Sequence, residues 1–136
     1  MSHVQTVQQL IGTLERLDVD GFRALLSDQV RWEHHPTGNT AQDADVPYMR
    51  LLQGRDAAGD FLRVIAEDFE MHHVEVLGYM EGEGRVAVLI GYELTVNATG
   101  KRVRDEEIHL YEFDDDGRIT AFRHFLDTAK AIEAHR

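Results

Sequence analysis

Residues 101–127, KRVRDEEIHLYEFDDDGRITAFRHFLD, carry the pattern of a β-hairpin with one histidine on each arm. At their centre, Asp114-Asp115-Asp116-Gly117 is typical of a turn between two runs rich in aromatic and aliphatic residues. Together the two arms carry a carboxylate and two imidazoles, with aromatic side chains around them. This hairpin is therefore where we expect any chemical function of the chain.

The register of the hairpin decides which of its side chains meet. If Phe113 pairs with Arg118 across the Asp-rich loop, His124 faces Glu107. Because side chains alternate across a strand, one face then collects a mixed set of polar and aromatic residues. The residues expected on this face are Glu107, His109, Tyr111, Thr120, Phe122 and His124. A change of register by one residue would send His124 to the opposite face.

His124 is the expected principal acid/base residue, with Glu107 orienting its imidazole and His109 as the second polar group. Cross-strand neighbours on one face lie roughly 5 Å apart at Cβ, which suits a carboxylate–imidazole hydrogen bond. Imidazole has an unperturbed pKa of about 6.5, so it exchanges protons near neutral pH. The alternative is that both histidines are ordinary interior residues, hydrogen-bonded to Glu107, a tyrosine or the backbone.

Outside the hairpin, the hydrophobic spacing is helical in the first half of the chain and alternating in the second. Helices are expected at residues 3–17, 18–27 and 55–69, with a helical tail at 126–136. Strands are expected at residues 30–35, 71–80, 85–97, 101–113 and 118–125, with 37–53 as the longest irregular stretch. Helices followed by a meander of antiparallel strands predict an α+β fold.

The composition excludes several classes of protein. A length of 136 residues fits one domain, residues 1–136, and the absence of cysteine excludes disulfides and thiolate chemistry. Acidic residues outnumber basic ones 25 to 14, and the formal charge of −11 argues against a nucleic-acid partner. No leader pattern and no apolar run of about 20 residues is visible. We therefore expect a cytoplasmic protein with no membrane partner.

Several short motifs, in this order along the chain, resemble the nuclear transport factor 2-like superfamily, which includes ketosteroid isomerases, limonene epoxide hydrolases and polyketide cyclases. The motifs are Leu17-Asp18-Val19-Asp20-Gly21-Phe22, Val30-Arg31-Trp32-Glu33, Gln53-Gly54-Arg55-Asp56-Ala57, Asp116-Gly117-Arg118-Ile119 and Arg123-His124-Phe125-Leu126-Asp127. The resemblance implies a cone-shaped, strongly curved sheet, mixed or antiparallel, wrapped around three helices of the N-terminal half. It also implies an apolar pocket, catalysis without metal or cofactor, and a homodimer through the outer sheet face.

The catalytic residues of these relatives are not kept. Similarity to ketosteroid isomerase matches the oxyanion tyrosine of that enzyme with Leu10 of this chain. It places the enzyme's base near His35 and matches its second oxyanion acid with His109. Similarity to limonene epoxide hydrolase places its aspartate-arginine-aspartate system at Tyr92, Ile90 and His124. Neither mechanism carries over, but His35, His109 and His124 occupy positions where relatives hold acids or bases.

A small, largely apolar molecule is the expected ligand, in a pocket containing His109 and His124. The expected lining residues are Trp32, Phe61, Tyr92, Tyr111 and Phe122. Of the adjacent residues His34 and His35, a regular strand points only one inward: the parity of Trp32 favours His34, and the family comparison favours His35.

Two classes of function stay open. The first is a cofactor-independent isomerase, cyclase or hydrolase that uses the histidines for acid/base chemistry. The second is a ligand-binding, dimerisation or accessory domain without turnover. The homodimer would use residues expected to point outward from the hairpin, namely Ile108, Leu110, Ile119, Ala121 and Phe125.

A metal site is a less favoured alternative. His35, His109, His124 and Glu107 offer ligands for zinc or iron, but no compact signature such as His-Glu-x-x-His is present. We expect no metal.

Overall fold

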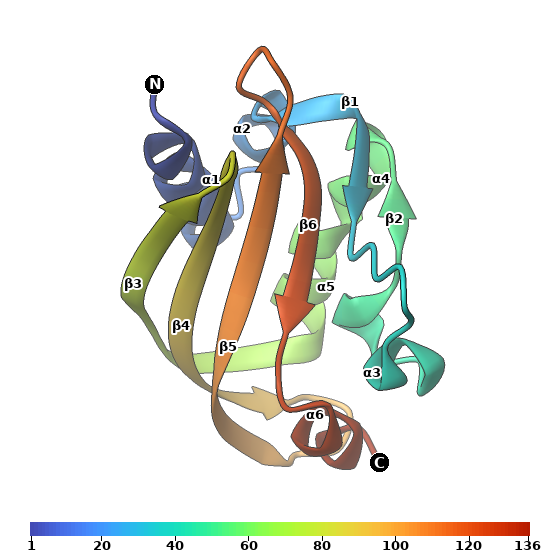
Figure 1. The fold of residues 1–136 in the computed structure, drawn as a ribbon. Coiled ribbons are helices and arrows are strands. Elements are labelled where there is room, and N and C mark those ends of the chain that lie inside the picture. Colours follow the sequence, from blue (N-terminus) through green and yellow to red (C-terminus); the bar gives the residue numbers. More distant parts are fainter.

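The computed structural model describes residues 1–136 and has an α+β fold (Figure 1). The helices are α1 (His3–Arg16), α2 (Val19–Ala24), α3 (Thr40–Asp43), the 3-10 helix η1 (Pro47–Met49), α4 (Arg55–Ala58), α5 (Asp60–Asp68) and α6 (Thr128–Ala134). The strands are β1 (Leu26–Trp32), β2 (Leu52–Gln53), β3 (Phe69–Gly82), β4 (Arg85–Val96), β5 (Arg102–Phe113) and β6 (Ile119–Phe125). They form one mixed sheet in the order β2-β1-β6-β5-β4-β3, with β1 and β6 parallel. The predicted fold class, a curved sheet wrapped around helices, is confirmed.

The two N-terminal helices begin at polar caps and bury one apolar side. The Ser2 hydroxyl accepts a hydrogen bond from the Gln5 amide at 3.1 Å, and the Gln5 side chain accepts one from the Ser2 amide at 2.9 Å. Asp18 caps α2 by accepting a hydrogen bond from the Gly21 amide at 3.0 Å. Leu10 of α1 and Phe22 of α2 are fully buried in the main core, so both helices fill the concave side of the sheet.

Strand β4 separates the two faces of the sheet. Every second residue from Val86 to Val96 is buried, and the residues between them are half-buried. Val86, Val88 and Ile90 belong to the main core, and Tyr92, Leu94 and Val96 belong to a second apolar cluster. This strict alternation is the period-2 pattern of a strand with one face in the core.

The hairpin register differs from the expected one by two residues. His109 pairs with His124, whereas Glu107 was expected opposite His124. Thr120 is the extra residue of a β-bulge and has no pairing partner, which changes the alternation next to the turn. Because the shift is even, both histidines and Glu107 stay on the concave face. The bulge also turns Ile119 inward, so its expected place on the outer face was wrong: it is fully buried.

The chain between the first strand and the third predicted helix also differs from expectation. Strand β1 covers Leu26–Trp32 rather than residues 30–35, because Glu33 takes a left-handed φ of 64° and ends the strand. The expected irregular stretch contains α3, η1 and β2. The helix expected at residues 55–69 is two helices, α4 and α5, that meet at Gly59.

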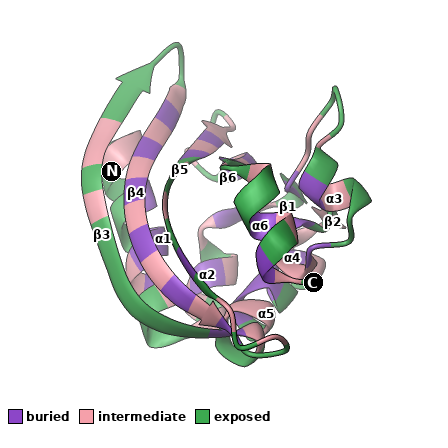
Figure 2. Cartoon of the chain, turned by 90° about the horizontal axis from the view of Figure 1, so that it is seen from below, coloured by how far each residue is buried: buried purple, intermediate pink, exposed green.

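Helix α6 lies at the lower end of the curved sheet, on the side of β6 and β1 (Figure 1, Figure 2). The Thr99 hydroxyl donates to the Ala134 carbonyl at 2.6 Å, and Lys101 pairs with Glu133 at 3.1 Å. These contacts fasten α6 to the turn between β4 and β5. None of the helices is both long enough and apolar enough to pass through a membrane.

Candidate functional site

Four ionisable side chains, three of them buried and one half-buried, gather on the concave face where β1, β5 and β6 meet. Glu33 follows β1, Glu107 and His109 lie on β5, and His124 lies on β6. The exposed fraction is 0 % for Glu33, 3 % for His124 and 6 % for His109. The Glu107 side chain is the most accessible of the four, at 13 %. Solvent therefore reaches the cluster from the side of Glu107.

Glu33 holds His124 at two points. One carboxylate oxygen accepts a hydrogen bond from the His124 backbone N–H and the other accepts from Nδ1–H, each at 2.7 Å. This assigns the proton to Nδ1 and turns Nε2 toward Glu107, whose Oε1 lies 3.8 Å away. The expected role of Glu107 as the residue that orients His124 is therefore corrected: Glu33 makes that hydrogen bond.

Glu107 makes its shortest contact with His109. Its Oε1 accepts a hydrogen bond from Nε2 of His109 at 2.7 Å, because the two residues are two apart on one strand and share a side. The Tyr111 hydroxyl lies 3.5 Å from the other ring nitrogen of His109, a long contact. The rings of His109 and His124 are 4.4 Å apart and nearly perpendicular. Glu33, His124, Glu107 and His109 thus form one continuous series of contacts.

The pair of Glu33 and His124 carries opposite charges. Burial by itself would raise the pKa of Glu33, but the charge and hydrogen bonds of His124 and a contact from His35 lower it to about 2. Burial by itself would lower the pKa of His124, but the charges of Glu33 and Glu107 and the hydrogen bond to Glu33 raise it to about 9. At neutral pH the pair is therefore an imidazolium beside a carboxylate.

The pair of Glu107 and His109 behaves differently. Burial opposes ionisation of Glu107, yet the charges of His124 and His109 and the hydrogen bond from His109 hold its pKa below the usual value. Burial lowers the pKa of His109, the nearby charge of His124 lowers it further, and Glu107 offsets only part of this. The cluster thus holds one protonated and one neutral imidazole between two carboxylates.

Two tyrosines stand at the edge of the cluster. Tyr48 of η1 packs edge-on against His124, with ring centroids 5.8 Å apart, and Tyr92 of β4 pairs with Asp105 of β5. Burial, followed by the negative charge of Glu107, raises the pKa of both phenols. Both therefore stay neutral and can donate a hydrogen bond.

The expected apolar pocket is largely filled by its own lining. Trp32, Phe61, Tyr111 and Phe122 are at most 4 % exposed and belong to the main core. Trp32 stacks on Phe122 with ring centroids 4.0 Å apart. Tyr92 belongs to a second apolar cluster with Phe69. These aromatic rings form a solid wall behind the histidines.

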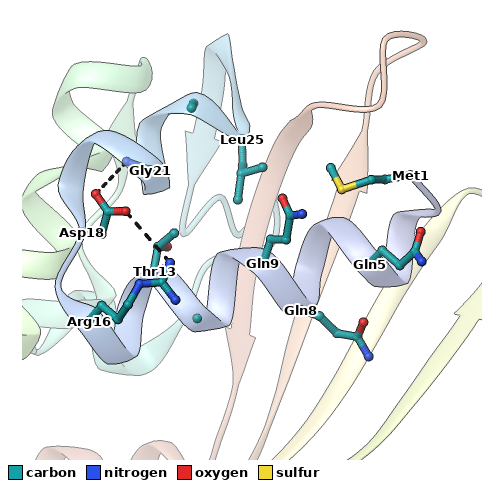
Figure 3. Close-up of a pocket in the computed structure, with 11 residues that line it drawn as sticks. Met1, Gln5, Gln8, Gln9, Thr13, Arg16, Asp18, Gly21 and Leu25 are labelled. Carbon is teal, nitrogen blue, oxygen red and sulfur yellow. Dashed lines mark hydrogen bonds and ion pairs between the residues drawn. The ribbon is translucent and has the colours of Figure 1, made fainter.

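Two hollows lie away from the clustered histidines. One of about 740 Å³ lies between α1 and α2, far along the chain from the histidines (Figure 3). Its charged residues are already engaged, since Asp18 accepts from the Gly21 amide at 3.0 Å and lies 4.0 Å from Arg16. A smaller groove of about 180 Å³ on the outer face includes Arg31 and Arg123.

His35 and His34 separate to different surroundings. The His35 side chain is 5 % exposed, and its Nε2 lies 3.6 Å from Glu33 Oε1. It also packs edge-on against Phe125. His34 lines the small outer groove instead. His35, expected among the catalytic residues, therefore lies behind Glu33 rather than beside Glu107.

Three of the clustered residues can share a cation. Ligand atoms of Glu107, His109 and His124 all lie within 4.8 Å of one another. A carboxylate and two imidazoles are a common donor set for divalent transition metals.

Comparisons with known proteins agree with this fold. The family model of the SnoaL-like domain matches residues 7–122. An NTF2-like protein from Burkholderia xenovorans has a TM-score of 0.84 at 20 % identity, covering 98 % of this chain and 95 % of its own. An NTF2-like protein of unknown function from Burkholderia pseudomallei has a TM-score of 0.78 at 28 % identity and 98 % coverage of both chains.

A third similar structure contains a ligand. A Mycobacterium tuberculosis protein in complex with estradiol-17beta-hemisuccinate has a TM-score of 0.69 at 16 % identity, covering 93 % of this chain and 95 % of its own. No curated protein sequence matches the chain. The family match spans most of the sequence and agrees with the curved sheet, so the chain belongs to the SnoaL-like, NTF2-like family.

Proposed function

We propose that this protein binds a small, largely apolar molecule beside the buried cluster and catalyses acid/base chemistry on it. The observation that carries the proposal is the position of buried His124 between two carboxylates, fully buried Glu33 and half-buried Glu107. The substrate would be of the steroid, terpenoid or polyketide type, and the reaction an isomerisation, cyclisation or hydrolysis.

The two sides of His124 have different roles in this proposal. Glu33 fixes Nδ1, so Nε2 is the atom that exchanges a proton with the substrate. Since its pKa is raised to about 9, His124 is protonated at neutral pH and acts first as the general acid. Glu107, ionised and the most accessible member, acts as the base. His109 positions Glu107 through the 2.7 Å hydrogen bond.

The substrate would reach Nε2 past η1 and α6. Tyr48 contacts His124, Phe69 and His135, so it stands between the cluster and α6. Movement of Tyr48 away from His124 would open a space with aromatic walls and neutral phenol donors. The steroid-like ligand of the similar Mycobacterium structure supports an apolar ligand in this fold.

A thermal-shift screen against steroids, terpenoids and aromatic polyketides tests the binding step, since a ligand of the folded state raises its stability. With a hit in hand, His124→Gln and Glu107→Gln should each reduce turnover by about 10²–10⁴-fold while keeping ligand binding. His72→Gln, at an exposed position on β3, is the matched control and should keep the parental rate. Parental turnover in His124→Gln would overturn the assignment.

A homodimer through the outer sheet face is a second proposal, and an apolar surface favours it. Leu77, Met80, Ile108 and Phe125 are 45 %, 51 %, 37 % and 45 % exposed. Ile108 pairs with Phe125 and with Leu89, so these three side chains are neighbours across the sheet. An apolar surface of this kind usually marks an interface.

Sedimentation equilibrium tests the dimer. The parent should sediment as a dimer at about 10 µM, an affinity range ordinary for such partners. Ile108→Glu should sediment as a monomer, while Gln8→Glu on exposed α1 should not change the mass. If the parent sediments as a monomer, the proposed homodimer is wrong, and a non-catalytic dimerisation role has no support.

A further inference from the structure

The cluster of Glu107, His109 and His124 has a second chemical capacity. We infer that these residues bind one divalent transition-metal ion through Glu107 Oε, His109 Nε2 and His124 Nε2. Glu33 would act as the outer carboxylate that holds His124. The inference does not depend on the proposed function, because it concerns an ion and no organic ligand.

The spacing of the three ligand atoms suits such an ion. Metal bonds of about 2.0–2.2 Å keep the ligands of a tetrahedral ion roughly 3.4 Å apart. Glu107 Oε1 lies 2.7 Å from His109 Nε2 and 3.8 Å from His124 Nε2, values on either side of that spacing. All three atoms lie within 4.8 Å of one another. Small side-chain rotations would therefore complete the set.

The groups behind the ligands are those that metal-bound histidines need. A histidine ligand generally donates its other ring N–H to a carboxylate, a carbonyl or water, which fixes the tautomer and the ring. Glu33 accepts from Nδ1 of His124 at 2.7 Å and is itself fully buried. The Tyr111 hydroxyl lies 3.5 Å from Nδ1 of His109. Glu33 thus keeps Nε2 of His124 directed at Glu107, and Tyr111 offers His109 a weaker partner at Nδ1.

The charges of the cluster favour a dication. Glu33 and Glu107 bring two carboxylates into the interior, and their ionic partners are histidines alone, without lysine or arginine. A divalent ion held by two neutral imidazoles balances both carboxylates, which lowers the penalty of burying them. His35, included in the metal set suggested by the sequence, lies behind Glu33 and is not a ligand.

Three protein ligands leave a fourth position for water or another small molecule. The ion would take the place of the Nε2 protons of both His124 and His109. His124 would keep its proton on Nδ1, facing Glu33, and the proton of neutral His109 would move to Nδ1, facing the Tyr111 hydroxyl. The metal-bound form and the form with imidazolium at His124 therefore exclude one another. Glu107 and its 13 % exposed side chain mark the side from which the ion enters.

Zn²⁺ titration of tag-free, chelator-stripped protein tests the inference by calorimetry. The parent should bind one Zn²⁺ per chain, and Glu107→Gln, His109→Gln and His124→Gln should each lose this binding. Glu33→Gln should keep the stoichiometry with an affinity about 10–100-fold lower, the usual effect of removing an outer partner. The double variant His72→Gln/His73→Gln, at exposed histidines on β3, should bind as the parent does.

Co²⁺ absorption of the parent gives a second readout that needs no variant. Intense visible bands of a four- or five-coordinate ion are expected, and the spectrum of aqueous Co²⁺ alone would overturn the inference. Absence of Zn²⁺ binding by the parent, or parental affinity in a folded His124→Gln variant, would overturn it as well. Because no organic ligand is present, these outcomes are separate from those of the turnover experiments.

Discussion

Replacing Glu33 with glutamine isolates the charge of the residue that holds His124. The substitution keeps the volume of the side chain and one acceptor oxygen, but it removes the negative charge. It also directs an amide N–H toward one of two donors that lie 2.7 Å away, the backbone N–H and Nδ1–H of His124. A buried imidazolium would then lack its nearest counter-charge. The expected result is a large loss of stability together with a lower pKa of His124.

The magnitude follows from burial. Breaking a buried ion pair by removing one partner typically costs about 3–5 kcal/mol, because an uncompensated charge remains inside. Natural domains are stable by roughly 5–15 kcal/mol, so Glu33→Gln is expected to remove about a fifth of the total or more. Glu93→Gln is the matched control. Glu93 and Arg102 also lie 2.7 Å apart, but on the surface, where such pairs contribute little.

Urea unfolding in the presence of a chelator measures both variants. The midpoint of Glu33→Gln should fall strongly at an unchanged slope, whereas the midpoint of Glu93→Gln should stay close to the parental one. Nuclear magnetic resonance titration of the His124 ring checks the accompanying pKa decrease. If both variants unfold at the same urea concentration, the buried pair does not contribute in the way described. The roles assigned to Glu33 would then lose their basis.

Further predictions concern pH, packing and the hairpin turn. In chelator-treated protein, the stabilisation from His124 should be complete below its unfolded pKa of 6.5 and lost as pH rises through about 9. The stabilisation from Glu33 should be complete above 4.5 and lost as pH falls through about 2, so the contribution of the Glu33–His124 pair should be largest between 4.5 and 6.5. Phe122→Ala should lower the unfolding free energy by about 3–5 kcal/mol, because the ring is 1 % exposed; a much smaller loss would show a loosely packed wall. Gly117→Ala should lower the unfolding free energy by about 1–2 kcal/mol, since Gly117 has a φ of 82° that disfavours a Cβ. Gly82→Ala, at a glycine without positive φ, should be no worse than neutral. Equal melting temperatures of the two variants would contradict this explanation.

The element types of the fold could be predicted from local patterns. Helical spacing around Leu10 and alternation along β4 are properties of short segments, and the Asp-rich turn before Arg118 has only a few structures open to it. The sharing of one face by Glu107, His109 and His124 also followed from the sequence, although the register was wrong. A shift of two residues moves partners along a strand and leaves every side chain on its own face.

The partner of His124 was decided by the tertiary structure alone. Glu33 is 91 residues away from His124 in the sequence. In a regular strand, its side chain would point to the face opposite that of its buried neighbour Trp32. A left-handed backbone at Glu33 reverses that direction, and no local signal marks a glutamate for this conformation. The parallel pairing of β1 with β6 then brings its carboxylate to His124. Sequence thus determined which groups face the interior, whereas long-range strand pairing decided which of them touch, because a hydrogen bond requires ångström placement that periodicity does not encode.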